Sequence, residues 1–197
     1  MTEHVMTTSR MDAFSDGVIA ILITIMVLEL HVPNEVTWEA LRPVFPVFLA
    51  YLLSFVFLGI YWANHHHLLQ LAERVNGAIL WANLHLLFWL SLIPFATEWM
   101  GEHPRAAVPT ALYGAILLCA GVAFTILQVA LIREHGHQSR LASALGRNAK
   151  GVISVTSYTI SIPIAFYKPG ISQAIFAAVA LMWLVPDPRI ERKLREG

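Results

Sequence analysis

Apolar runs of roughly membrane-spanning length recur along most of the chain, separated by short segments that hold the charges. A hydrocarbon core of about 30 Å is crossed by a helix of about 20 apolar residues. By this measure the predicted spans are about 11–30, 44–62, 79–97, 106–132, 152–167 and 171–185. The pattern therefore predicts an all-α, polytopic membrane protein with six transmembrane helices.

The last two runs are short, and a turn signal joins them. Lys168, Pro169 and Gly170 stand between them, where proline fixes a bend and glycine tolerates positive φ. We expect a helical hairpin, with a re-entrant pair as the alternative. In both cases the two flanks of the pair lie on the same side of the membrane.

The connections between the predicted spans are short. We find no internal repeat of fixed period and no polar insertion long enough to fold by itself, and the longest connection, 133–150, is polar and basic. Residues 1–197 are therefore expected to form one membrane domain with no soluble catalytic module.

Lysine and arginine residues are unequally divided between alternate connections. Positive residues are retained on the cytoplasmic side of a membrane. One set of connections and termini holds ten of them: Arg10, Arg74, Arg133, Arg140, Arg147, Lys150, Arg189, Arg192, Lys193 and Arg195. The other set holds three: Arg42, Arg105 and Lys168. Both termini are therefore predicted to be cytoplasmic, and glutamates at the opposite ends predict an acidic outer face.

The composition excludes several classes of function. Hydrophobic residues make up 57% of the chain and charged residues 13%, about half the usual share of a soluble domain. Thirteen basic residues balance thirteen acidic ones, so no large basic surface is available for nucleic acid. The sequence contains no Gly-x-Ser-x-Gly elbow and no Walker loop. We expect neither an enzyme nor a bound cofactor.

Polar residues gather at the predicted cytoplasmic ends of the first three spans. A carboxylate such as Asp16 is costly inside a membrane unless it faces protein or water. We expect it to join a buried hydrogen-bonded cluster that ties the three helices together. The residues at this level are Arg10, Ser15, Asp16, Trp62, Asn64, His66, His67 and Asn83. Asp12 is more simply interpreted as a helix cap.

Histidines also suggest a metal site, but their spacing argues against one. The consecutive residues His65, His66 and His67 fan around a helix at about 100° per residue, so they cannot all converge on one ion. His135 and His137 follow Glu134, and this is not the order of a helical zinc protease. We therefore expect no metal site.

One face of the first predicted span is aliphatic with a single hydroxyl. Ile21, Thr24, Ile25 and Leu28 are spaced i, i+3, i+4 and i+7, which places them on one side of an α-helix. Every other side is apolar as well. Periodicity alone therefore leaves open whether this face meets lipid, protein or a pore.

A second stripe competes for the packing role. Ala20, Ile23 and Val27 continue in line with Asp16, and we expect this stripe to face the second and third spans. The Thr24 hydroxyl has a simple alternative role, because it can bond back to the carbonyl four residues earlier in any helix.

The polar residues of the first span form a recognisable order. Arg10-x-x-x-Phe14-Ser15-Asp16-Gly17 begins the span, and the segments 27–30, 62–67 and 83–97 follow. Together they resemble bacterial members of the transmembrane protein 175 family. Members of that family are potassium channels with six helices per subunit, assembled as tetramers, and their animal relatives carry two such units per chain. The family lacks the Thr-Val-Gly-Tyr-Gly filter, and so does this sequence.

The resemblance implies a homotetrameric potassium channel in the cell membrane, with the first helix of each subunit lining the pore. Ile21 is then the hydrophobic constriction, Thr24 supplies a layer of hydroxyls, and Ile25 and Leu28 continue the same face. Arg10, Phe14, Ser15 and Asp16 are implied to be structural and not ion ligands.

Two other classes of function stay open. In a small proton-coupled secondary transporter, Asp16 and a histidine would bind and release protons. Secondary transporters commonly contain inverted repeats and broken helices, and we find neither in the sequence. The other class is a scaffold subunit that carries no flux.

Overall fold

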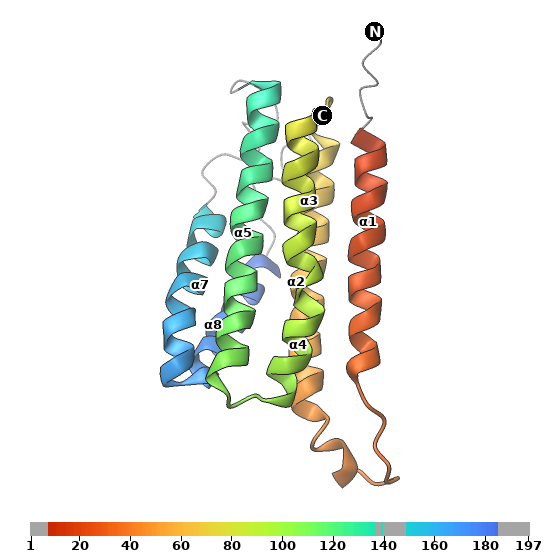
Figure 1. Ribbon diagram of the computed structural model, residues 1–197, viewed down its shortest axis with the longest axis vertical. Coiled ribbons are helices and arrows are strands. Elements are labelled where there is room, and N and C mark those ends of the chain that lie inside the picture. The colour runs from red at the N-terminus through yellow and green to blue at the C-terminus, as the bar shows by residue number, and fades with distance from the viewer. Residues whose placement is uncertain (1–7, 137–138, 140–148, 185–197) are drawn as a thin grey trace.

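The computed structural model describes residues 8–136, 139 and 149–184. All regular structure in this part of the chain is helical (Figure 1). The elements are α1 (Thr8–Ile25), η1 (Met26–Glu29), η2 (Glu39–Leu41), α2 (Phe45–Gln70), α3 (Gly77–Ser91), α4 (Ile93–Glu102), α5 (Ala107–His135), α7 (Ala149–Tyr167) and α8 (Pro169–Leu184). The predicted all-α fold is confirmed.

The long helices stand side by side, with α1 at one edge of the bundle and α7 and α8 toward the other (Figure 1). α5 packs against both α3 and α7, and α1 packs against α2 and α3. Among the described residues, with α3 and α4 counted as one, five helical stretches are long and apolar enough to cross a membrane. α8 has 16 residues and is shorter than the roughly 20 that a span needs.

Several bounds differ from the predicted spans. α2 continues to Gln70 and does not end at Trp62, and α5 continues to His135. Polar residues had marked the ends of these spans, but a helix can continue past the hydrocarbon wherever its polar side chains find partners or water. The first span begins at Thr8 and leaves α-helical geometry after Ile25. Residue 185, Arg140, Arg147, Arg189, Arg192, Lys193 and Arg195 lie outside the described residues.

The third span consists of two helices. α3 ends at Ser91, and α4 begins at Ile93 with Pro94 in its first turn. Proline has no backbone N–H and its ring collides with the preceding helical turn, so the helix is interrupted just before it. At its other end α3 is capped by Asn76, whose side-chain Oδ1 accepts from the Ile79 N–H at 3.0 Å.

A buried chain of hydroxyls joins α2, α4 and α5. Ser54 Oγ lies 2.6 Å from Thr97 Oγ1 and 2.8 Å from the Tyr113 hydroxyl. Thr97 already donates its proton to the Ile93 carbonyl at 2.7 Å. Ser54 therefore donates to Thr97 and accepts from Tyr113, so every hydroxyl in the chain has a partner. Such bonds hold helices together where no water is available.

α2 and α4 approach each other closely at Gly101. A Cβ atom on this residue would lie 2.9 Å from the Val47 Cα, so only glycine fits this crossing. At the far side of the bundle α7 and α8 pack together and are joined by Lys168 alone. Ser172 Oγ donates to the Ser161 carbonyl across this pair at 2.7 Å. The two helices form a hairpin.

Candidate functional site

The packed face of α1 is centred on Ser15. The buried residues of the helix and its 3₁₀ extension are Met11, Ser15, Ile19, Leu22 and Met26. The predicted packing stripe was therefore wrong, because Ala20 and Val27 are exposed and Ile23 is only half-buried. The prediction placed the side of α1 that carries Asp16 against the second and third spans. In the structure the Asp16 side chain extends toward Trp62 on α2, and it is Ser15 that points into the bundle.

Three polar side chains from three helices form a continuous buried chain. Asn83 Nδ2 on α3 donates to Ser15 Oγ on α1 at 2.9 Å, and Ser15 Oγ donates to the Met11 carbonyl at 2.9 Å. His65 Nε2 on α2 lies 2.7 Å from Asn83 Oδ1. An amide oxygen only accepts, so the Nε2–H of His65 is the donor. All three side chains are at most 1% exposed.

His65 is the member of this chain that the sequence analysis missed, since we assigned the histidine role to His66 and His67. A usable signal was present in the sequence. His65 shares a helical face with apolar residues before and after it, such as Leu58 and Leu69, and all of them are buried. Its position on the apolar stripe of α2 indicates burial better than its place in a run of histidines.

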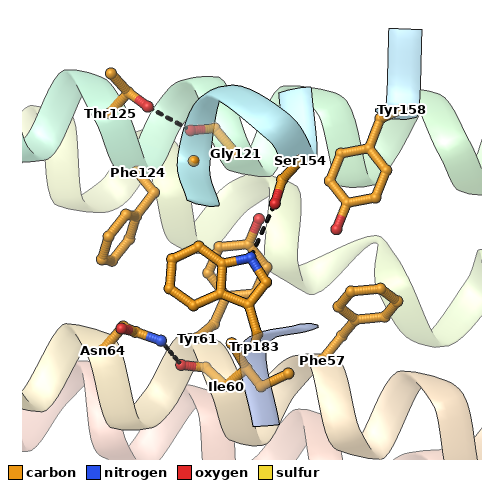
Figure 2. A pocket seen from close by; sticks show the side chains of 11 residues that line it. Phe57, Ile60, Tyr61, Asn64, Gly121, Phe124, Thr125, Ser154, Tyr158 and Trp183 are labelled. Atoms are coloured by element: carbon orange, nitrogen blue, oxygen red, sulfur yellow. Dashed lines mark hydrogen bonds between the residues drawn. The ribbon is translucent and has the colours of Figure 1, made fainter. Parts of the chain in front are cut away.

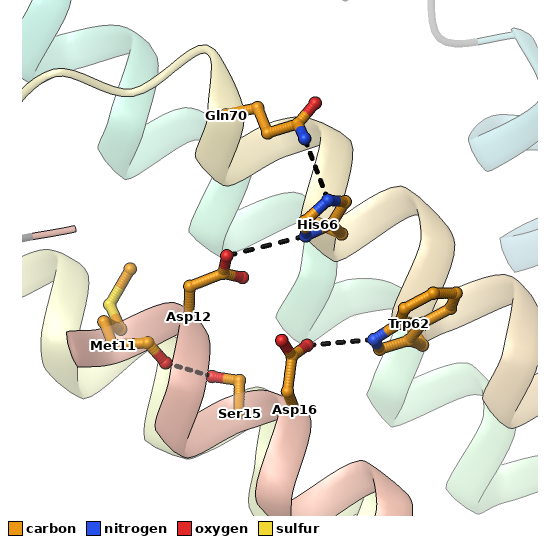
Figure 3. Close-up of polar contacts among 7 residues, drawn as sticks. All are labelled: Met11, Asp12, Ser15, Asp16, Trp62, His66 and Gln70. Atoms are coloured by element: carbon orange, nitrogen blue, oxygen red, sulfur yellow. Dashed lines mark hydrogen bonds and ion pairs between the residues drawn. The ribbon is translucent and has the colours of Figure 1, made fainter. Parts of the chain in front are cut away.

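The carboxylates of α1 have their own partners on α2 (Figure 3). Trp62 Nε1 donates to Asp16 Oδ1 at 2.9 Å. His66 Nδ1 lies 3.5 Å from Asp12 Oδ2, and the Gln70 side-chain amide contacts His66 Nε2 at 2.8 Å. The Trp62 and His66 rings stack with their centroids 6.0 Å apart. Asp12, which we interpreted as a cap, thus faces a histidine of the neighbouring helix.

The remaining residues of the predicted network lie apart from it. The Asn64 side chain donates to the Ile60 carbonyl of its own helix at 2.8 Å. His67 is exposed, and its ring lies beside that of His66, with the two centroids 6.3 Å apart. Arg10 and Phe14 are both exposed. Within one chain the structure therefore brings together part of the predicted set.

The aliphatic stripe of α1 is uncovered. Ile21 is 59% exposed, Ile25 39% and Leu28 73%, and Thr24 is exposed beside them. The Thr24 hydroxyl lies 3.1 Å from the Ala20 carbonyl and 2.9 Å from the Ile21 carbonyl, so it bonds back to its own helix. Leu28 lies in the 3₁₀ segment, where a turn takes three residues, and it still remains exposed.

A separate cavity lies between α2, α5, α7 and α8 (Figure 2). Five of its eleven lining residues are aromatic, with Tyr61 against Phe124 and Phe57 against Tyr158 in edge contacts. Trp183 closes it by donating from Nε1 to Ser154 Oγ at 2.8 Å. Its volume of about 50 Å³ suits a few water molecules. No part of α1 lines this cavity.

The fold and the contacts describe a multi-pass membrane protein. One side of its first helix is hydrogen-bonded and packed against α2 and α3, and the opposite side is exposed. Residues 10–94 match the family model described as "Endosomal/lysosomal potassium channel TMEM175". A protein named potassium channel from Chryseobacterium sp. (strain P1-3) is 52% identical over 192 residues, which cover 98% of this chain and 100% of that protein. The chain therefore belongs to the TMEM175 family.

Two further comparisons agree with this assignment. The crystal structure of a lysosomal potassium-selective channel TMEM175 homolog from Chamaesiphon minutus superposes with a TM-score of 0.74 at 28% identity, covering 90% of this chain and 96% of that one. The zebrafish (Danio rerio) endosomal/lysosomal proton channel TMEM175 is 29% identical over 132 residues, which are 64% of this chain and 24% of that protein. These relatives are ion channels and not enzymes, as the sequence predicts.

Replacing Asn83 by alanine tests the buried chain. The change leaves His65 Nε2 and Ser15 Oγ without their partner, and an unsatisfied buried group costs about 1–3 kcal/mol. We expect a clearly lower melting temperature in detergent. Asn64→Ala is the matched control, because Asn64 bonds only within α2. Equal melting temperatures for the two variants would show that the chain does not hold α1 in place.

Proposed function

We propose that this protein is a potassium channel of a cell membrane, built from four copies around an axis that α1 lines. The potassium assignment is supported by the names of the bacterial relatives and of the similar solved structure. The Ile21 face of α1 is exposed in one copy, so several copies around an axis are needed to enclose a path along it. We propose four because the family resemblance implies a tetramer.

The observation that carries the proposal is the uncovered face of α1. Ser15 and its partners fix the opposite side of the helix to α2 and α3. The Ile21, Ile25 and Leu28 side chains are left without cover, and α1 lies at the edge of the bundle (Figure 1). When four subunits are arranged around an axis beside α1, this face turns inward.

Ile21 is proposed as the narrowest point of that path. Four isoleucine side chains around an axis form a ring that water leaves when the ring is tight, and a dewetted ring is a gate. Potassium loses its hydration water more readily than sodium, so a narrow apolar ring favours it. Thr24 helps by offering an oxygen: its proton points to backbone carbonyls, which leaves lone pairs to face a cation.

We also propose that both termini are cytoplasmic. The division of lysine and arginine between the connections supports this orientation. Carboxylates gather at the opposite end, where Glu29 interacts electrostatically with Glu98, and Glu29 and Glu102 line the same surface depression. Negative side chains beside the end of α1 raise the local concentration of cations, as suits the outer mouth of a cation channel.

Cysteine labelling tests the orientation. In a Cys119→Ala background, Lys168→Cys should react with a membrane-impermeant maleimide on intact cells. In the proposed orientation the α7–α8 connection lies on the outer side of the membrane. Arg74→Cys, at a position that is also exposed in one chain, should react only after the cells are permeabilised. The reverse pattern would invert the topology.

The assembly is tested by mass. Native mass spectrometry of the detergent-purified protein, with cross-linking in membranes as a second measurement, should give four chains. One exposed α1 face cannot enclose a path alone, so a stable monomer or dimer would contradict the channel proposed here.

The constriction is tested by replacing Ile21 with asparagine. The polar side chain wets the ring and lowers the dewetting barrier, so potassium flux into vesicles should rise severalfold and the preference over sodium should weaken. Ile160→Asn is the control, since Ile160 is 50% exposed on α7, away from α1. Its selectivity should equal that of the wild type. If Ile21→Asn assembles normally but selects like the wild type, this face of α1 does not line the path.

Proton conduction is a second candidate, favoured by the name of the zebrafish relative and by the carboxylate and histidine pair at the cytoplasmic end of α1. The same vesicles separate the two candidates. A pH-sensitive dye reports proton entry when potassium is absent. Flux that saturates and requires a proton gradient would instead indicate a coupled transporter.

A further inference from the structure

Three potential metal ligands converge at the cytoplasmic end of α1. Asp12 and Asp16 are four residues apart and so lie on one side of the helix, and His66 faces them from α2 (Figure 3). One ligand atom of each lies within 4.8 Å of the ligand atoms of the other two. The consecutive histidines could not share an ion. The fold instead brings one of them to two carboxylates of another helix.

The atoms at this point are short of partners. Asp12 Oδ1 and His66 Nδ1 are both shielded from solvent and have no hydrogen bond. The Nδ1 of the neighbouring His65, whose side chain is 1% exposed, is also unpartnered, and that ring interacts electrostatically with both carboxylates. Buried polar atoms nearly always have a partner, and a bound water or ion is one explanation for an exception.

The surroundings resemble the outer shell of a metal site. Histidines that bind metals usually have their second ring nitrogen held by another polar group, and ligand carboxylates are hydrogen-bonded in turn. Here the Gln70 amide holds His66 Nε2 at 2.8 Å, and the Trp62 indole N–H holds one oxygen of Asp16 at 2.9 Å. Oxygen and nitrogen of an amide can be exchanged by a flip, so Gln70 can accept from Nε2–H when Nδ1 binds a metal.

We propose that Asp12, Asp16 and His66 bind a divalent first-row transition-metal ion. Two carboxylate oxygens and one imidazole nitrogen are a donor set that such ions accept, and three protein ligands leave positions open for water. The imidazole argues against magnesium or calcium, which prefer oxygen. The ion would bridge α1 and α2 beside the buried Ser15 chain. The proposal does not depend on which ion the protein conducts.

Cobalt binding to the EDTA-treated, detergent-purified protein tests the site. Co²⁺ gives visible absorption bands that report coordination by nitrogen and oxygen. We expect one ion per chain for the wild type and an at least tenfold weaker affinity for Asp12→Asn and for His66→Gln. Gln70→Ala, at an exposed position, should weaken binding about 10- to 100-fold through the outer shell. His67→Gln, the neighbouring exposed histidine, is the matched control and should bind like the wild type.

Thermal unfolding gives an independent measure. An ion that binds only the folded protein raises its melting temperature, so Co²⁺ should stabilise the wild type and the His67→Gln variant more than the three site variants. The proposal is overturned if the wild type binds no Co²⁺, or if Gln70→Ala and any folded variant of Asp12 or His66 bind it as tightly as the wild type. A protein that binds Co²⁺ as expected but carries no potassium would refute only the channel function.

Discussion

Polar groups inside a bilayer have no water to bond with, so each must find a partner in the protein. In this chain the polar groups that pair at α1 are one serine, one asparagine and one histidine from three helices, each at most 1% exposed. Their geometry leaves little freedom, because Ser15 has to face Asn83 and Asn83 has to face His65. The rotation of α1 about its own axis is thereby fixed.

The fixed rotation of α1 determines which of its side chains are exposed. The aliphatic side with Ile21 and Leu28 cannot turn into the bundle without breaking the buried chain, so it stays at the edge. The hydroxyl chain of Ser54, Thr97 and Tyr113 plays the corresponding part for α2, α4 and α5. The two polar chains give the bundle specific contacts between its helices.

Three different roles for the N-terminal end of α1 rest on the same few residues. A structural tie, a proton route and a metal site all draw on the carboxylates and histidines near Asp16, and chemistry alone does not choose among them. What separates them is the degree of burial. Ser15, Asn83 and His65 are buried and hold the helices together, whereas Asp12 and His66 are half-buried and keep atoms without a hydrogen-bond partner.

The sequence by itself determined the all-helical class, the number of helical units and the family, because apolar run length and the order Arg10 to Gly17 are local properties of the chain. It also indicated that Ser15, Asp16 and Asn83 belong near the meeting point of three helices. Which residues touch there was decided only by the tertiary structure. Helices that are apolar on every side carry no periodic signal for rotation, so the choice of His65 over His67, the buried stripe through Ser15, and the meeting of Asp12 with His66 depend on how neighbouring helices pack.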